Sequence, residues 1–358
     1  MGMIQLEQII NQFEIQGDFL SCDSYGNGHI NDTYRVKYKD ESGISKYVLQ
    51  RINHNVFRNP EYVVHNINLV LSQFHKLGIE NLRTFSANGK PYIIDSNNDY
   101  WRLYNFVSNS KSVDVIENQD QAYEAANAYA SFLKNLAPLD PSSFYETIPQ
   151  FHDLGFRYDQ FEKALANADK IRLNNAKIDI EYVQKQRLIL DEMKLILDEG
   201  NIPLRITHND TKLNNVLLDK DTGKALCVID LDTVMPAYAF NDYGDMIRTF
   251  TSPVPEDESD QSKVYVRKEI FESLTSAYIS GLKDILTKAE CNSLLLGAKY
   301  MVLIIGLRFL TDYLAGDTYF KVHYDTHNLV RARNQFALLR SIEDQEVYLQ
   351  EIIQKFSN

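Results

Sequence analysis

The sequence is poor in cysteine, tryptophan and positive charge. Its 358 residues include one tryptophan and three widely separated cysteines, Cys22, Cys227 and Cys291. So few cysteines predict neither a disulfide framework nor a cysteine-based metal site. Lysine and arginine total 37 against 49 aspartates and glutamates, which gives a formal net charge of −12. This balance disfavours binding to nucleic acid or to an anionic membrane, so we expect small-molecule partners.

The sequence also lacks a secretory signal and a long apolar run. The first residues show no charged segment followed by an apolar core. The most apolar run, residues 300–307, ends at Arg308 and is far shorter than a bilayer span. A cytoplasmic location, where ATP is available, is the expectation. The oligomeric state is not fixed by the sequence, and we take a monomer as the working expectation.

What the sequence does contain is a run of polar residues between short apolar segments. Asp210, Lys212 and Asn215 lie within six residues, and Asp230 and Asp232 follow the apolar pair Val228-Ile229. These residue types suit phosphoryl transfer. That reaction needs a carboxylate that accepts the proton of the attacking hydroxyl, a role that fits Asp210. It also needs a positive charge close to the transferred group, which Lys212 would supply. Mg²⁺ prefers amide and carboxylate oxygens, which Asn215 and Asp230 provide.

A polar loop between two strands is the alternative interpretation, since Asn and Asp are common turn residues. The surroundings favour the catalytic one. An apolar segment at 216–218 and another at 225–229 are joined by a turn at 219–223, so a hairpin would place Asn215 and Asp230 at neighbouring strand ends. Asp232 lies two residues beyond Asp230 and could share its face and ligate metal, or be a solvated or helix-capping carboxylate.

The chain resembles the aminoglycoside phosphotransferase and choline kinase superfamily, and within it the bacterial N-acetylhexosamine 1-kinases. The stretches that carry this resemblance are residues 25–34, 207–218, 229–236, 243–248, 308–314 and 317–320. The resemblance implies an α+β, bilobal, protein-kinase-like fold: an N-terminal lobe with an antiparallel sheet and a helix, and a larger, mainly helical C-terminal lobe. It also implies ATP and Mg²⁺ as cofactors, and a structural Asp245 that braces the catalytic loop from a following helix.

Residue patterns agree with this division of the chain. Aromatic and β-branched runs at 33–38, 47–50 and 101–107 predict strands, and apolar residues at helical spacing after Asn59-Pro60 predict a helix. Further helices are expected near 121–136 and 181–197. We therefore expect a nucleotide-binding lobe at residues 1–107 and a catalytic and substrate-binding lobe at residues 108–358.

The nucleotide site is expected at a glycine loop and at the lobe junction. Gly26, Asn27 and Gly28 would let backbone amides approach phosphates, although such a turn is often a plain hairpin. Tyr104, Asn105 and Phe106 resemble the kinase hinge that pairs with adenine, or are a core strand entering a linker. The third strand has Gln50 where protein kinases have lysine, and Arg51 should point to the opposite face.

For the acceptor, the resemblance implies His29, Asn31, Arg308 and Tyr319 together with Asp210. Arg308 could instead form a salt bridge with Asp312 one helical turn later. The expected activity is transfer of phosphate from ATP to the anomeric hydroxyl of GlcNAc or GalNAc. The alternatives are a kinase of another small alcohol, such as choline, homoserine or methylthioribose, and a degenerate kinase fold that only binds, which Gln50 would favour.

Overall fold

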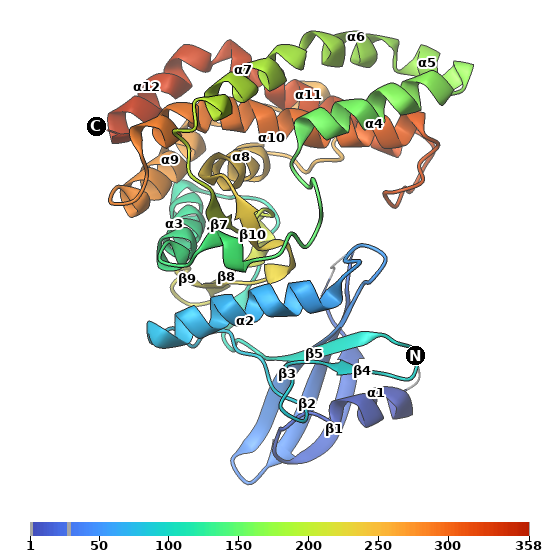
Figure 1. The fold of residues 1–358 in the computed structure, drawn as a ribbon, viewed down its shortest axis with the longest axis vertical. Coiled ribbons are helices and arrows are strands. Elements are labelled where there is room, and N and C mark those ends of the chain that lie inside the picture. The colour runs from blue at the N-terminus through green and yellow to red at the C-terminus, as the bar shows by residue number, and fades with distance from the viewer. Residues whose placement is uncertain (1–2, 27–29, 358) are drawn as a thin grey trace.

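The computed structural model describes residues 3–26 and 30–357 and shows a two-lobed, kinase-like fold (Figure 1). The smaller lobe contains an antiparallel sheet, and the larger lobe is mainly helical. This confirms the predicted fold class. The calls for Asn27, Gly28 and His29 lie outside the described residues.

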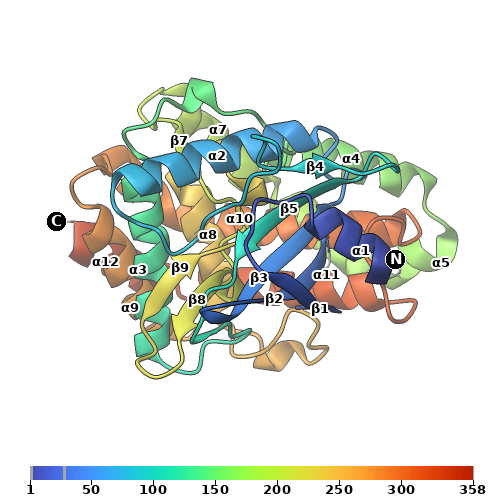
Figure 2. The same cartoon turned by 90° about the horizontal axis from the view of Figure 1, so that it is seen from below.

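The sheet of the smaller lobe has five strands in the order β1-β2-β3-β5-β4. Their bounds are β1 Asp18–Ser24, β2 Asp32–Asp40, β3 Gly43–Ile52, β4 Ile93–Ile94 and β5 Tyr100–Asn105. Helix α1, Met3–Ile10, packs against the outer face of this sheet (Figure 2). Alternate residues such as Leu49, Trp101 and Leu103 are fully buried there and form a small separate core. The three predicted strand runs are therefore strands.

Helix α2, Pro60–Lys76, begins with proline in its first turn, as expected, and lies between the sheet and the larger lobe (Figure 1). Its apolar residues Val63, Ile67 and Val70 belong to the core of the larger lobe and not to that of the sheet. Buried Asn66 donates hydrogen bonds to the carbonyl oxygens of Tyr145 and Val234, both at 2.8 Å. The helix is therefore attached to the larger lobe.

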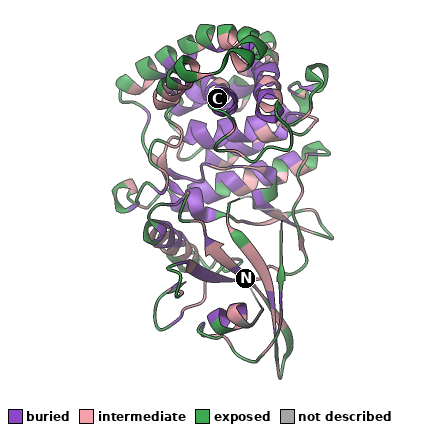
Figure 3. Ribbon diagram, turned by 90° about the vertical axis from the view of Figure 1, so that its right-hand side faces the viewer, coloured by how far each residue is buried: buried purple, intermediate pink, exposed green. Residues whose placement is uncertain are grey.

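The larger lobe is built around long buried helices (Figure 3). Its helices are α3 Gln119–Leu136, α4 Leu154–Asn167, α5 Lys170–Asn175, α6 Lys177–Lys185, α7 Arg187–Asp198, α8 Ala239–Phe250, α9 Lys268–Leu282, α10 Lys288–Leu314, α11 His327–Asp344 and α12 Glu346–Ser357. Short strands pair beneath them: β7 Arg205–Thr207 with β10 Met235–Ala237, and β8 Val216–Asp219 with both β6 Ser110–Lys111 and β9 Ala225–Val228. The predicted lobe division at 107/108 falls between β5 and β6.

Helices α8 and α10 approach each other closely because both have glycine at the contact. A Cβ atom added at Gly244 would come within 2.5 Å of the carbonyl oxygen of Gly297, so a larger residue would force the helices apart. Among the described residues, α10 is the one helix long and apolar enough to cross a membrane, and 78% of its apolar window is buried inside the fold. It is thus the central core helix of this lobe.

One helix prediction needed correction. The region near 181–197 is not one helix, because α6 ends at Lys185 and α7 begins at Arg187. The apolar run 300–307 lies within α10, which continues past Arg308 to Leu314. The side chain of Arg308 lies over aromatic rings, where its apolar stem can be buried.

Candidate active site

The catalytic loop runs from β7 into a short 3-10 turn, Leu213–Asn215, and then into β8. Asn209 adopts a left-handed backbone, with φ of 64°, and its side-chain amide donates to the carbonyl oxygens of Thr207 and Thr233. Asp242 of α8 accepts hydrogen bonds from the N–H groups of His208, at 2.9 Å, and Asn209, at 2.7 Å. The loop is therefore held in one conformation from both sides.

Asp242, and not Asp245, is the carboxylate that braces the loop backbone. Asp245 forms a buried salt bridge with Arg248 at 2.8 Å and receives only a long contact, 3.5 Å, from the hydroxyl of Thr211. The bracing role expected of Asp245 therefore stays a prediction, and its contact with the loop is through the Thr211 side chain. Both aspartates lie on α8, whose orientation is fixed by its glycine contact with α10.

Asp210, Lys212 and Asn215 come together as expected. The Lys212 ammonium lies 2.8 Å from one oxygen of Asp210 and 2.9 Å from the other, and the Asn215 amide donates to the second oxygen at 3.2 Å. Burial acts to raise the pKa of Asp210, but Lys212 outweighs it and the pKa is lowered. Asp210 is therefore an ionised carboxylate, the form that a general base requires.

The β8–β9 hairpin brings Asp230 to this cluster. Val216 pairs with Val228, and the N–H of Ile229 donates to the carbonyl oxygen of Asn215 at 2.8 Å. His208 links the same two segments, with Nε2 2.9 Å from the carbonyl oxygen of Ile229. Asp230 itself has a left-handed backbone, φ 60°, and is exposed. The predicted hairpin and its placement of Asn215 beside Asp230 are present.

The donor set suits a magnesium ion that also binds substrate phosphates. Surrounding protein atoms and the nearby carboxylates of Asp232 and Asp210 raise the pKa of Asp230 to about 7, and a divalent cation would relieve this repulsion. The Asn215 amide nitrogen is used internally, which leaves its oxygen as a ligand. The described residues contain no cluster of three His, Cys, Asp or Glu able to hold a metal. Mg²⁺ usually binds through one or two protein groups plus phosphates, so Asn215 and Asp230 fit.

Asp232 is buried, and each of its two carboxylate oxygens contacts another side chain. One oxygen lies 2.6 Å from the guanidinium of Arg102, and the other accepts from the side-chain amide of Asn31 at 2.7 Å. The oxygen of the Asn31 amide in turn accepts from the N–H of Asn53. Metal ligation by Asp232 and acceptor binding by Asn31 remain predictions. In either role the side chain would have to give up some of the contacts described here.

The proposed nucleotide contacts are only partly described. Gly26 has a left-handed backbone, φ 81°, consistent with its place in a turn between β1 and β2. At the lobe junction, the N–H groups of Asn105 and Phe106 donate to the carbonyl oxygens of Arg83 and Lys46. Adenine pairing at Tyr104, Asn105 and Phe106 therefore stays a prediction, with these two amides already bonded.

Arg308 lies among aromatic rings near Asp210. Its guanidinium carbon is 5.5 Å from the ring centre of Phe151, 5.7 Å from that of Tyr319 and 5.4 Å from that of Phe320. No carboxylate of the described residues lies within salt-bridge distance of it. Burial lowers the pKa of Arg308, while the charge and side-chain hydrogen bond of Tyr319, and the charge of Asp210, act in the opposite direction. Among the described residues, the guanidinium is therefore surrounded by aromatic side chains and not by carboxylates.

Asp312 is not the partner of Arg308. Its carboxylate accepts from the N–H groups of Thr318, Tyr319 and Phe320 at 2.8 to 2.9 Å, and from the side chain of Asn328 at 2.9 Å. It therefore fixes the loop that carries Tyr319 and Phe320 over Arg308. The alternative in which Arg308 and Asp312 form a salt bridge is wrong.

His152 and Arg157 complete this region and were missed from the sequence. His152 Nε2 lies 2.9 Å from the carbonyl oxygen of Asn209, the residue before Asp210, and burial lowers the pKa of His152 to about 4. Burial and the charge of Arg308 lower the pKa of Arg157 to about 10. Neither residue belongs to a motif, and their approach depends on the packing of α4 against α10.

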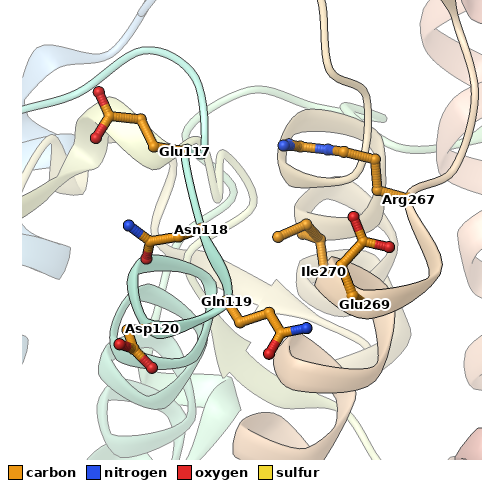
Figure 4. Close-up of a pocket in the computed structure, with 7 residues that line it drawn as sticks. All are labelled: Glu117, Asn118, Gln119, Asp120, Arg267, Glu269 and Ile270. Carbon is orange, nitrogen blue, oxygen red and sulfur yellow. The ribbon is translucent and has the colours of Figure 1, made fainter.

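A surface hollow elsewhere does not compete with this site. It lies where α3 and α9 begin (Figure 4) and is lined by Glu117, Asn118, Gln119, Asp120, Arg267, Glu269 and Ile270. Its one cation, Arg267, already donates to the carbonyl oxygens of Ile116, Phe250 and Thr251. An acidic hollow of this kind is unsuited to a nucleotide.

Comparison with known proteins identifies the family. Residues 22–265 match the family model described as "Phosphotransferase enzyme family". The chain belongs to this family. The match includes both the glycine loop and the Asp210–Asp230 site of this phosphotransferase.

Solved structures share the fold over nearly the whole chain. An aminoglycoside phosphotransferase from Alicyclobacillus acidocaldarius is 13% identical, with a TM-score of 0.61 and coverage of 98% of this chain and 96% of that one. A microcompartment-associated aminopropanol kinase is 15% identical, with a TM-score of 0.65 and coverage of 97% and 98%. A choline kinase from Cryptosporidium parvum is 14% identical, with a TM-score of 0.59 and coverage of 99% of both chains. At these identities the likeness shows the fold alone.

Proposed function

We propose that this phosphotransferase uses ATP and Mg²⁺ to phosphorylate the anomeric hydroxyl of an N-acetylhexosamine, GlcNAc or GalNAc, in the cytoplasm. The nucleotide part is supported by the family and by a related fold, a spectinomycin phosphotransferase, whose structures contain ADP or AMP. In the reaction Asp210 accepts the hydroxyl proton while the hydroxyl oxygen attacks the γ-phosphorus and ADP leaves. Lys212 balances the charge that develops on the transferred group.

The observation that carries the choice of acceptor is Arg308, which lies near Asp210 and forms no salt bridge with the described carboxylates. Burial and the charge of Arg308 lower the pKa of the neighbouring Arg157. A cationic acceptor such as choline or an amino alcohol would add a third positive charge, whereas cation recognition calls for acidic groups and open aromatic faces. A neutral sugar offers hydroxyl and amide oxygens that a guanidinium can donate to, and ring C–H faces that pack on Phe151 and Tyr319.

The choice of the anomeric hydroxyl rests on the sequence resemblance to N-acetylhexosamine 1-kinases. It is supported by the presence of Arg308 and Tyr319 side by side in one aromatic cluster. His29, which the resemblance also places at the acceptor, lies outside the described residues.

A panel of acceptors tests this proposal. ATP consumption is measured with GlcNAc, GalNAc, glucose, galactose, choline, ethanolamine and homoserine, and Asp210→Asn provides the background of acceptor-independent hydrolysis. We expect turnover with the two N-acetylhexosamines, and ³¹P NMR of the product should show phosphate coupled to the anomeric proton. Turnover with choline or ethanolamine in preference to sugars would overturn the acceptor assignment. ATP binding with no turnover on any alcohol would favour a degenerate, binding-only kinase fold.

A further inference from the structure

On the face of the five-stranded sheet that contacts the larger lobe, a positive charge lies on β5, at Arg102. Protein kinases place a lysine on the third strand, whereas β3 has Gln50 there. Gln50 is directly opposite Arg102 of β5 in the antiparallel register, so both side chains point to the same face. The Gln50 amide oxygen accepts from Arg102 Nε at 3.1 Å and Nη2 at 2.8 Å, and its nitrogen donates to the hydroxyl of Thr33 at 3.2 Å. A neutral side chain thus holds a neighbouring cation.

Arg102 is 2% exposed, and its charge is balanced across the lobe boundary. Its Nη2 lies 2.6 Å from Asp232, which belongs to the turn Leu231–Thr233 of the larger lobe. The face of its guanidinium lies 5.2 Å from the ring centre of Tyr104. A buried arginine held on three sides in this way is rigid, and a buried charge pair of this kind is strongly destabilised when one partner is removed.

This ion pair is important because three carboxylates lie close together and only some of them have a cationic partner. Asp210 is paired with Lys212, and Asp232 is paired with Arg102. Asp230 has no ion-pair partner among the described residues. The two cations therefore leave Asp230 as the carboxylate with an unneutralised charge for a divalent cation.

We propose that Arg102 is a positioning residue that replaces the missing strand lysine. It acts through Asp232: the ion pair fixes the turn that follows Asp230 to β5 and thereby fixes the position of Asp230. The ligand concerned is the magnesium complex of a nucleoside di- or triphosphate. This inference rests on the proposed function only in assuming that the nucleotide binds here.

Nucleotide titration without any acceptor tests the inference. The variants are Arg102→Met, Arg102→Lys and the double variant Gln50→Lys/Arg102→Met, which returns a cation to β3. The matched control is Arg51→Met, because Arg51 follows Gln50 on β3 but points to the opposite face of the sheet, where it pairs with Asp32 and Asp99. The measurements are the Kd values of MgATP, MgADP and adenosine, the Mg²⁺ dependence of ATP binding, and the Tm.

We expect Arg102→Met to weaken MgATP and MgADP binding by roughly 10- to 100-fold, the usual effect of losing a group that orients a metal ligand. Adenosine binding should stay within about twofold, since adenosine has no phosphate and needs no metal. The double variant should recover part of the MgATP affinity, and Arg51→Met should bind MgATP like the wild type. Such a split between phosphate-bearing and phosphate-free ligands would not arise from a purely structural role.

Two results would overturn the inference. One is an Arg102→Met variant that binds MgATP like the wild type. If that variant does not fold, Arg102→Lys decides the matter, because lysine keeps the charge but lacks the planar guanidinium that adds the Nε contact with Gln50 and lies over the Tyr104 ring. A folded Arg102→Lys protein with wild-type MgATP affinity and Mg²⁺ dependence is the second overturning result. A wild-type protein that binds no nucleotide at all would instead overturn the proposed function, and this inference with it.

Discussion

Asp312→Asn should impair use of the acceptor while leaving ATP binding intact. The carboxylate is 5% exposed and holds the loop of Tyr319 and Phe320 over Arg308 through three backbone N–H groups. In the amide variant one oxygen can still accept from Thr318 and Tyr319. The other becomes an NH₂ group facing the N–H of Phe320 and the side chain of Asn328, which are both donors.

The magnitude follows from the two hydrogen bonds that are lost when this one oxygen is replaced. Hydrogen bonds to a charged group are worth ~1.5–3 kcal/mol each, but this loop is near the surface and water recovers part of that loss. We expect the position of residues 318–320 over Arg308 to be destabilised by about 2 kcal/mol, which corresponds to a fall in acceptor kcat/KM of roughly 30-fold. The dissociation constant of ATP should change by less than about twofold.

Steady-state kinetics with the acceptor varied, ATP titration by calorimetry, and hydrogen exchange of residues 318–320 measure these effects. Asp325→Asn is the matched control, because Asp325 is an exposed aspartate in the same connection between α10 and α11, and no described residue forms a hydrogen bond with its side chain. The reasoning is refuted if Asp312→Asn speeds hydrogen exchange of the loop yet keeps the acceptor kcat/KM of the wild type.

Four further predictions concern the site itself. Asp210→Asn should keep the fold and nucleotide binding but lower turnover by ~10²–10⁴-fold, and near-normal kcat would remove Asp210 from the mechanism. Asn215→Ala and Asp230→Ala should raise the Mg²⁺ concentration for half-maximal activity, Asp230→Ala more strongly because it also removes charge; unchanged Mg²⁺ titrations would contradict the metal assignment. Lys212→Met removes the ammonium that lowers the pKa of Asp210, so the base becomes protonated at higher pH and the acidic limb of the kcat profile should move upward in pH; an unmoved limb would show that Lys212 does not set it. Arg308→Ala should lower acceptor kcat/KM by roughly 10- to 150-fold, with the ATP dissociation constant within about a factor of two and no matching loss in Asp325→Asn; equal losses for ATP and acceptor would place Arg308 outside the acceptor pocket.

The parts of the site that the sequence predicted are those that are close in the chain. Asp210 and Asn215 share one tight loop, and a single hairpin brings Asp230 to them, so residue types and turn signals were enough. The strands of the front sheet and the helix after Pro60 were predicted for the same reason, since their patterns are local.

The rest depends on contacts between distant segments. Arg308 and Asp312 have the spacing of a helical salt bridge, but three N–H groups of the following loop and the Asn328 side chain of α11 occupy the carboxylate. The bond between Arg102 and Asp232 joins residues 130 positions apart and requires the register of β3 and β5 to be known. Asp242 could have been found only from the orientation of α8, which the Gly244–Gly297 contact decides.

The attachment of α2 to the larger lobe limits how such an enzyme could be switched. Many protein kinases are turned on and off by movement of the corresponding helix relative to the catalytic loop. Here the apolar face of α2 is part of the large core, and the Asn66 amide is bonded to Tyr145 in both directions as well as to Val234. Moving the helix would open that core and break these three hydrogen bonds. The five-stranded sheet and α1 are then the parts of the smaller lobe that could move relative to the larger lobe. Such an enzyme would not be inactivated by displacement of α2, and its rate would depend on the concentrations of its substrates.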